Sequence, residues 1–162
     1  MEAEWYKLEI FLKAWDLDNL REYDEVRKEA SPKKHKTHFG RVYPLCHIKH
    51  SEIATKNIKY KGRVVFIGNS LTDESAYSAI FSEQGSSTSH LAAAKYRDAI
   101  ARRHECDGED SDAMRAYTQA YMEGEETWVF IPKERRPAWW SKLGLHNPIC
   151  RLRRNLYGHP CA

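Results

Sequence analysis

The sequence predicts an α+β fold in which helices pack against an antiparallel sheet. Its 162 residues are about one domain long, and a chain with 41% hydrophobic and 30% charged residues has a globular composition. Apolar residues recur at helical spacing near the N-terminus. The clearest strand is Lys59-Tyr-Lys-Gly-Arg-Val-Val-Phe-Ile-Gly68, which ends in a turn-like Gly68-Asn69. Together these observations favour one domain that contains both kinds of element.

Two amphipathic helices are expected in the first 30 residues. The first covers about residues 2–14 and is indicated by apolar side chains at helical spacing: Trp5, Leu8, Phe11, Leu12 and Trp15. A second follows, with Asp18 as its N-cap and Ser31-Pro32 as its end. We expect the aromatic side chains of these helices to lie in the core rather than contact a ligand.

Three further segments predict strands. Residues 40–49 form one strand that Pro44 interrupts, and residues 126–131 form another that Pro132 ends. Residues 148–152 are the expected hairpin partner of the second. A loop or short helix with Trp139 and Trp140 connects these two strands.

Two helices are expected between the strands. Residues 90–103 form a helix whose small alanines allow close packing against the sheet. A shorter helix begins near Asp112, a residue type that is favoured at a helix start, and carries Tyr117 and Tyr121 on one face.

The charges are unevenly distributed although the net charge is only +3. An acidic block at residues 105–126 lies between basic blocks at residues 56–63 and 133–154. This pattern suits a metal site beside a phosphate-binding surface, although most charge runs are solvated faces. Side chains alternate along a strand, so Lys59, Lys61 and Arg63 project from one face about 6 to 7 Å apart, near the spacing of backbone phosphates. The alternative is a solubilising sheet edge.

Several classes of protein are not favoured. No apolar run approaches the roughly 20 residues that span a bilayer, and the acidic Glu2 and Glu4 do not suit a secretory signal. We therefore expect an intracellular protein of the cytoplasm or nucleus, without a membrane. Four widely spaced cysteines predict reduced thiols, and the histidine pairs at residues 35–38 and 47–50 have no second pair at zinc-finger spacing.

The order of three motifs resembles the reverse transcriptase domain of Ty1/copia retrotransposons. The strand at residues 59–68 resembles the family's Tyr-Lys-Ala-Arg-Leu-Val-x-x-Gly strand, and Asp112-Ala-Met-Arg-Ala-Tyr117 resembles its Asp-x-x-x-Ala-Phe/Tyr motif. Cys150-Arg-Leu-Arg-Arg-Asn-Leu-Tyr-Gly158 is similar to its Cys-x-Leu-x-x-x-Leu-Tyr-Gly element. The resemblance covers about residues 4–160 and includes two N-terminal tryptophans. The chain departs from the family pattern at Ala120, Ile67 and His159-Pro160.

The resemblance implies a single partial reverse transcriptase domain over residues 1–162, with the partial fingers and palm of a right-hand polymerase. About residues 1–90 would hold the N-terminal helices and a fingers-like region, and about residues 91–162 a partial palm. The implied reaction is template-directed nucleotidyl transfer, in which two Mg²⁺ ions activate the primer hydroxyl and hold the leaving pyrophosphate. Its partners are an RNA or DNA template-primer and deoxynucleotide triphosphates.

The resemblance also assigns roles to individual residues. Asp112 is the first metal ligand and catalytic carboxylate, or by the alternative reading a helix N-cap. Tyr117 packs under the incoming sugar and excludes a 2′-hydroxyl, or is a core residue of its helix. Lys61 and Arg63 lie near the triphosphate. The basic residues expected to contact nucleic acid are Lys59, Arg151, Arg153 and Arg154.

The family's second carboxylate motif, Tyr-x-Asp-Asp, does not occur within these residues. We therefore expect the isolated chain to be inactive as a polymerase. Two alternatives remain, a non-catalytic nucleic-acid-binding remnant and a host interaction module that kept only the fold. A partial palm is also expected to expose a sheet edge, which favours self-association.

Overall fold

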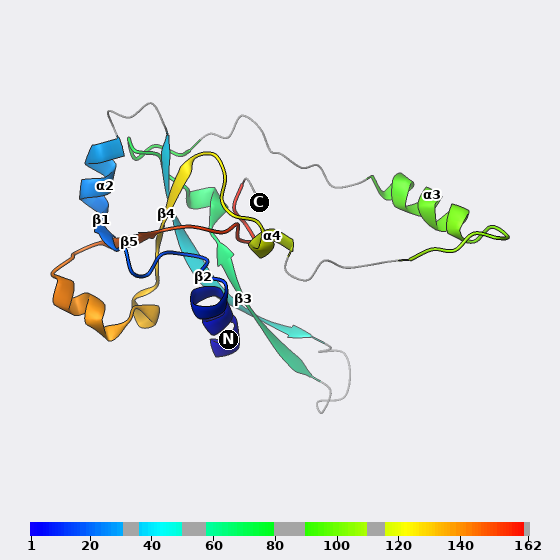
Figure 1. The fold of residues 1–162 in the computed structure, drawn as a ribbon, viewed down its shortest axis with the longest axis horizontal. Coiled ribbons are helices and arrows are strands. Elements are labelled where there is room, and N and C mark those ends of the chain that lie inside the picture. Colours follow the sequence, from blue (N-terminus) through cyan, green and yellow to red (C-terminus); the bar gives the residue numbers. More distant parts are fainter. Residues whose placement is uncertain (31–35, 50–57, 80–89, 110–115, 161–162) are drawn as a thin grey trace.

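The fold is a mixed five-stranded sheet with helices attached to it (Figure 1). The computed structural model describes residues 1–30, 36–49, 58–79, 90–109 and 116–160. The strand order is β1-β5-β4-β2-β3. The strands are β1 (Arg21–Glu22), β2 (Thr37–Lys49), β3 (Lys59–Phe66), β4 (Glu126–Phe130) and β5 (Pro148–Arg151). The α-helices are α1 (Glu2–Tyr6), α2 (Tyr23–Ala30), α3 (Leu91–Ala101) and α4 (Ala116–Gln119).

Four short helical segments complete the secondary structure of the described residues. They are a π-helix (Lys7–Phe11) and three 3₁₀ turns (Gly68–Ser70, Lys133–Arg135 and Ala138–Leu143). The last of them contains Trp139 and Trp140, which confirms the short helix expected between β4 and β5.

The sheet is not purely antiparallel, and the prediction is wrong at one strand pair. The pairs β2–β3, β4–β5 and β1–β5 are antiparallel, and β4–β5 is the hairpin pair that was expected. Strand β1 was not predicted. However, β2 and β4 run parallel from Thr37↔Glu126 to Arg41↔Phe130. Parallel neighbours require a crossover connection rather than a tight turn. The chain between these two strands supplies it, because it includes β3, α3 and α4.

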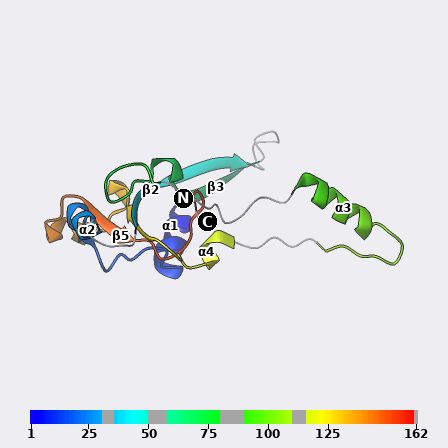
Figure 2. The same cartoon turned by 90° about the horizontal axis from the view of Figure 1, so that it is seen from above.

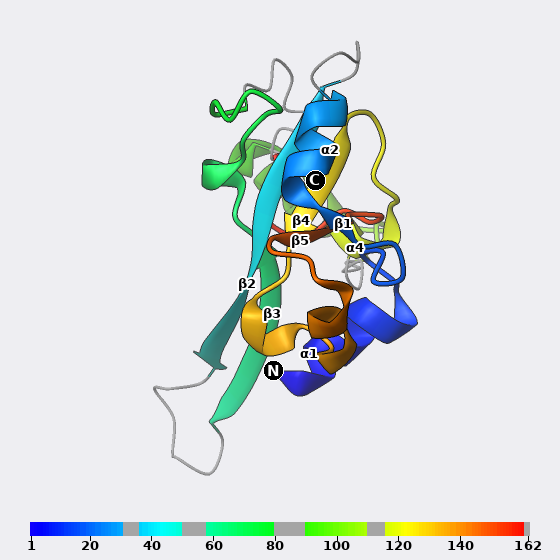
Figure 3. The ribbon, with the colours of Figure 1, turned by 90° about the vertical axis from the view of Figure 1, so that its left-hand side faces the viewer.

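The two halves of strand β2 have different neighbouring strands. Its first part pairs with β4, and its second part, Val42 to Lys49, pairs with β3 alone. The second part therefore forms a two-stranded ribbon that extends away from the rest of the sheet (Figure 3). The strand continues through Pro44, which pairs with Val64, so the expected interruption is absent. A sheet accepts proline where a strand is paired on one side only.

The N-terminal helical segment packs across the base of the ribbon. Trp5, Leu8 and Trp15 are buried, and the rings of Trp5 and Trp15 meet edge to face at 5.6 Å. The predicted place of Trp5 and Trp15 in the core is confirmed, but Phe11 is 75% exposed, so the prediction is wrong for that residue. The helix ends with the π-helix at Phe11 rather than near Ala14. Gly62 permits the close approach, since a Cβ there would lie 2.9 Å from the Met1 Cα.

The second helix begins later than expected, at Tyr23. Arg21 and Glu22 instead pair with β5, and the Glu22 carboxylate accepts hydrogen bonds from the backbone N–H groups of His146 and Asn147. Asp18 is therefore not the N-cap. The first helical N–H, that of Tyr23, donates to the Asn147 carbonyl at 3.1 Å.

Helix α3 exists where it was predicted, but it does not back the sheet. None of its residues is buried, and Leu91 and Tyr96 are 69% and 71% exposed. Figures 1 and 2 show the helix apart from the sheet. Its large apolar side chains do not form one stripe around the helix, so the sequence offers no continuous face for packing.

No helix in the described residues is both long and apolar enough to cross a membrane.

Candidate nucleic-acid interface

The ribbon carries a face of positive charge, defined here as the basic face. Paired residues on neighbouring strands share a face, and Lys59 pairs with Lys49 while Lys61 pairs with His47. The sequence-predicted residues Lys59, Lys61 and Arg63 therefore join cationic side chains of β2. All members are exposed: Arg41, His47, Lys49, Lys59, Lys61 and Arg63.

The opposite face of the ribbon is apolar at its base, where Val42, Val64 and Phe66 enter the core. Neither β2 nor β3 contains an aspartate or glutamate. Like charges placed directly opposite each other, such as Lys49 and Lys59, destabilise a sheet. A bound polyanion would relieve that repulsion. The basic face is thus suited to phosphate groups.

Arg63 and Tyr117 both contact one aromatic ring, that of Tyr157. The Arg63 guanidinium carbon lies 5.6 Å from the centre of this ring. The ring of Tyr117, on α4, meets it edge to face at 4.7 Å. We call these three residues the aromatic junction. The structure thus brings two predicted nucleotide-binding residues, Arg63 of β3 and Tyr117 of α4, to the same ring.

The position of Tyr157 is fixed by the backbone. The Phe66 N–H, at the end of β3, donates to the Tyr157 carbonyl at 2.7 Å. The next residue, Gly158, has a φ of 88°, and a Cβ there would overlap the Phe66 carbonyl oxygen. The glycine of the Leu-Tyr-Gly element is therefore needed for this close approach. Tyr157 was not among the predicted site residues, although the motif that contains it was noticed.

The predicted catalytic and metal-binding residue, Asp112, lies outside the described residues. Within the part of the chain that the structure describes, no group of three or more His, Cys, Asp or Glu side chains is placed to hold a metal ion. Mg²⁺ in nucleotidyl transfer needs several oxygen ligands. The described residues alone do not supply them, so no Mg²⁺-dependent step is assigned to them.

The three C-terminal arginines of the nucleic-acid prediction already have partners within the chain. Arg154 donates to the carbonyls of Leu12, Thr118 and Gln119 at 2.8, 3.3 and 2.9 Å, and it stacks on Tyr121. It fastens α4 to the N-terminal segment.

Arg151 and Arg153 are less committed to the fold. Arg153 pairs with Asp16, and its side chain is 47% exposed. Arg151 approaches Glu126 at 3.5 Å with its side chain 57% exposed. Of the three C-terminal arginines, Arg151 is therefore the most available to bind a phosphate.

Two histidines, His38 and His159, are buried, which was not predicted. His38 Nε2 lies 2.9 Å from a Glu125 carboxylate oxygen, and burial lowers the pKa of His38 although Glu125 acts in the opposite direction. His159 packs on the Phe66 ring at 4.8 Å, and burial lowers its pKa to about 4. His159, a departure from the family pattern, is thus a core residue.

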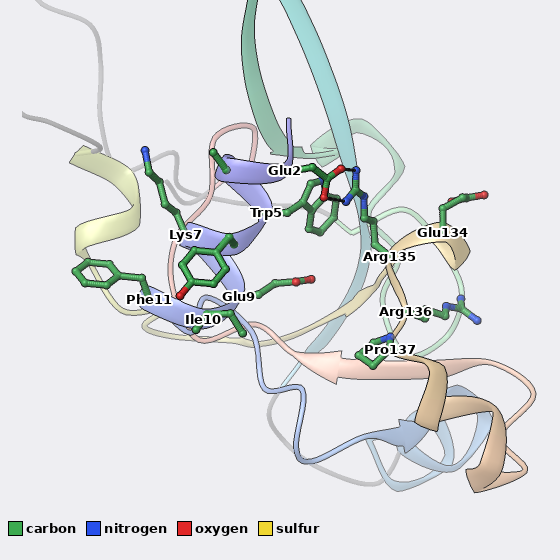
Figure 4. Close-up of a pocket in the computed structure, with 12 residues that line it drawn as sticks. Glu2, Trp5, Lys7, Glu9, Ile10, Phe11, Glu134, Arg135, Arg136 and Pro137 are labelled. Atoms are coloured by element: carbon green, nitrogen blue, oxygen red, sulfur yellow. Dashed lines mark hydrogen bonds and ion pairs between the residues drawn. The ribbon is translucent and has the colours of Figure 1, made fainter.

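A groove of about 930 Å³ lies between the N-terminal helical segment and residues 134–137 (Figure 4). Trp5, Glu9 and Arg135 are among its lining residues, and Arg135 forms a two-point ion pair with Glu2. Burial raises the pKa of Glu9, and nearby Arg135 opposes that shift. None of the sequence-predicted site residues lines this groove. It is therefore separate from the basic face.

Fold and site together define a mixed α/β protein with an exposed basic ribbon. Comparison of the chain with protein-family models, with curated proteins and with solved structures found no match. Its functional interpretation therefore depends on its own residues.

Proposed function

We propose that this chain is part of a retrotransposon RNA-directed DNA polymerase and that, as an isolated chain, it binds nucleic acid without polymerising. The observation that carries the proposal is the aromatic junction. The resemblance assigns Arg63 and Tyr117 to the incoming nucleotide, and these residues come from separate segments of the chain. Both contact the ring of Tyr157. A nucleotide site requires that residues from these two segments lie close to each other.

Each member of the junction has a distinct task in the proposal. Arg63 presents a planar set of N–H donors, which suits a triphosphate. Tyr157 orients the guanidinium through its ring face and is a positioning residue. Tyr117 is 40% exposed, so its ring is available to pack under a sugar. Such packing would favour deoxynucleotides, because a 2′-hydroxyl needs additional space.

The basic face supplies the electrostatic part of binding. Each lysine or arginine that neutralises a phosphate releases counterions, so affinity falls with salt concentration. The ribbon is two-stranded and exposed, so its cations can contact the phosphates along a duplex. The face is also free of carboxylates in both strands. A template-primer duplex is therefore the partner that suits it.

The test is binding of a fluorescent RNA–DNA primer-template by the full chain, measured by anisotropy across 50–200 mM salt. The variant Lys49→Gln/Lys59→Gln/Lys61→Gln removes three cations of the basic face. We expect the slope of log affinity against log salt to become shallower by about 2 to 3, at roughly 0.9 per phosphate contact.

The matched control, Lys28→Gln/Lys133→Gln/Lys142→Gln, removes the same charge from exposed sites elsewhere. It should change the slope much less. Equal slopes for both variants would show that binding does not use the basic face. No binding by the wild type at low salt would refute nucleic-acid binding and favour the host interaction module.

The polymerase part of the proposal has its own test. In a longer polypeptide that continues this chain into an Asp-Asp motif, Asp112→Ala should abolish primer extension and leave primer-template affinity nearly unchanged. Retained extension would remove Asp112 from the site. A chain that binds nucleic acid but supports no extension in that setting would be a non-catalytic remnant.

A further inference from the structure

Helix α3 is an uncovered helix with two cations within it and two directly after it. It is described together with the loop that follows it, through residue 109, and it contains no buried residue. Residues 91–103 hold four cations, Lys95, Arg97, Arg102 and Arg103, against one acid, Asp98. Arg97 donates two hydrogen bonds to Asp98 at 3.3 and 3.1 Å, so this acid is already engaged.

Of the three other cations, Lys95 lies within α3, Arg102 is its C-cap residue and Arg103 follows the helix. At about 100° per residue, Arg102 is roughly 20° around the axis from Lys95. The rise from Lys95 to Arg102 is about 10 Å, which is enough for the two side chains to reach different phosphates. In the part of the chain that the structure describes, no hydrogen bond or ion pair joins these three side chains to another residue.

Two small residues, and Leu91 about 40° from Lys95 in the other direction, lie near these cations. Ala92 and Ala99 fall within the same sector, about 60° and 40° from Lys95. They have no side chain long enough to hold a partner away from the helix. We call Lys95, Arg102 and Arg103 with these alanines the α3 face.

The acidic loop after α3 packs on the other side. A Cβ at Gly108 would lie 2.6 Å from the Ala101 Cβ, and Ala101 lies about 240° around the helix from Lys95. Asp107 and Glu109, the acids beside Gly108, line a hollow of about 750 Å³ together with Arg102. Arg102 therefore lies at the edge of the α3 face, next to these acids. Lys95 does not line that hollow.

From this arrangement we infer that the α3 face is a second nucleic-acid contact, which binds phosphate groups independently of the basic face. The inference rests on the proposed function for its class of partner. An anionic membrane is the competing partner for a basic helix, but a membrane-bound helix needs a broad apolar side. At about 100° per residue, Tyr96 and Ile100 lie about 40° apart, but Leu91 lies about 140° and 180° from them. The large apolar side chains therefore do not form a broad apolar side.

The test uses the full chain with Lys95→Gln/Arg102→Gln/Arg103→Gln and the same primer-template and salt series. We expect a slope shallower by about 2 to 3 and an affinity roughly 10- to 100-fold lower at 100 mM salt. Thermal unfolding should be unchanged, because α3 buries no residue. The control is the triple lysine variant at residues 28, 133 and 142. An unchanged slope would overturn the inference.

The two proposals fail in distinguishable ways. If the basic-face variant behaves as the wild type and the α3 variant loses affinity, the basic face is wrong and the α3 face stands. If only the basic-face variant loses affinity, the α3 face is wrong. Vesicles of phosphatidylcholine with phosphatidylserine complete the test. Binding to them that depends on Lys95, without an effect of the α3 variant on the primer-template, would also overturn the inference.

Discussion

Replacing Gly158 by alanine should destabilise the protein strongly, because two separate costs meet at this residue. Its φ of 88° is in the region that L-residues avoid, which costs roughly 1–2 kcal/mol. The new Cβ would also overlap the Phe66 carbonyl oxygen. Relieving that overlap costs about 1–3 kcal/mol and strains the 2.7 Å hydrogen bond from the Phe66 N–H to the Tyr157 carbonyl. We expect a total loss of about 2–5 kcal/mol in the free energy of unfolding.

Gly144→Ala is the matched control. Gly144 has a φ of 68°, but nothing lies within 4 Å of the position its Cβ would take. Only the backbone cost remains, so we expect a loss of about 1 kcal/mol. Urea unfolding followed by tryptophan fluorescence measures both variants, since Trp5 and Trp15 are buried. Losses that agree within about 0.5 kcal/mol would refute the role given to the Phe66 contact.

Other predictions concern titration, reactivity and the arginines. Because burial lowers the pKa of His159 to about 4 from 6.5, stability should be full above pH 6.5 and fall by roughly 3 kcal/mol towards pH 4. Urea midpoints across pH measure this, and an unchanged slope in His159→Phe would contradict it. Burial raises the pKa of Cys150, whereas Cys46 and Cys106 are exposed, so iodoacetamide should label Cys46 and Cys106 before Cys150. Peptide mass spectrometry would show any reversal. Arg154→Ala should cost about 2 kcal/mol and Arg151→Ala under about 0.5 in thermal unfolding, and equal costs would contradict the structural role of Arg154.

Local pattern was enough to locate most strands of this fold. The charges of β3 alternate along the strand, and the prolines and apolar runs marked β4 and β5. The parallel pairing of β2 with β4 was missed because nothing local distinguishes a crossover from a long hairpin. The late start of α2 was missed for a similar reason, since Arg21 and Glu22 are taken into the sheet by residues far along the chain.

In the candidate site, too, the features set by local sequence could be predicted and those set by distant residues could not. Alternation along β3 was sufficient to place Lys59, Lys61 and Arg63 on one face, and the same alternation in β2 could have added Lys49 and His47. The hydrogen bonds of Arg154 to distant carbonyls could not be predicted. A run of basic residues does not show which of them will form hydrogen bonds within the fold and which will remain exposed. The exposure of α3 could not be predicted either, because its alanines are equally compatible with a buried and with a solvent-exposed helix.

Strand β2 belongs to two environments, and its amides should exchange with solvent at two different rates. From His38 to Arg41 the strand lies beside β4, and most of these residues are buried. Near Lys49 it has β3 as its one neighbour and is exposed on both faces. Protection against hydrogen exchange should therefore decrease along one continuous strand. Because the base of the ribbon is held in the sheet and its far end can open locally, the ribbon could adjust its twist to a bound surface while its base stays fixed.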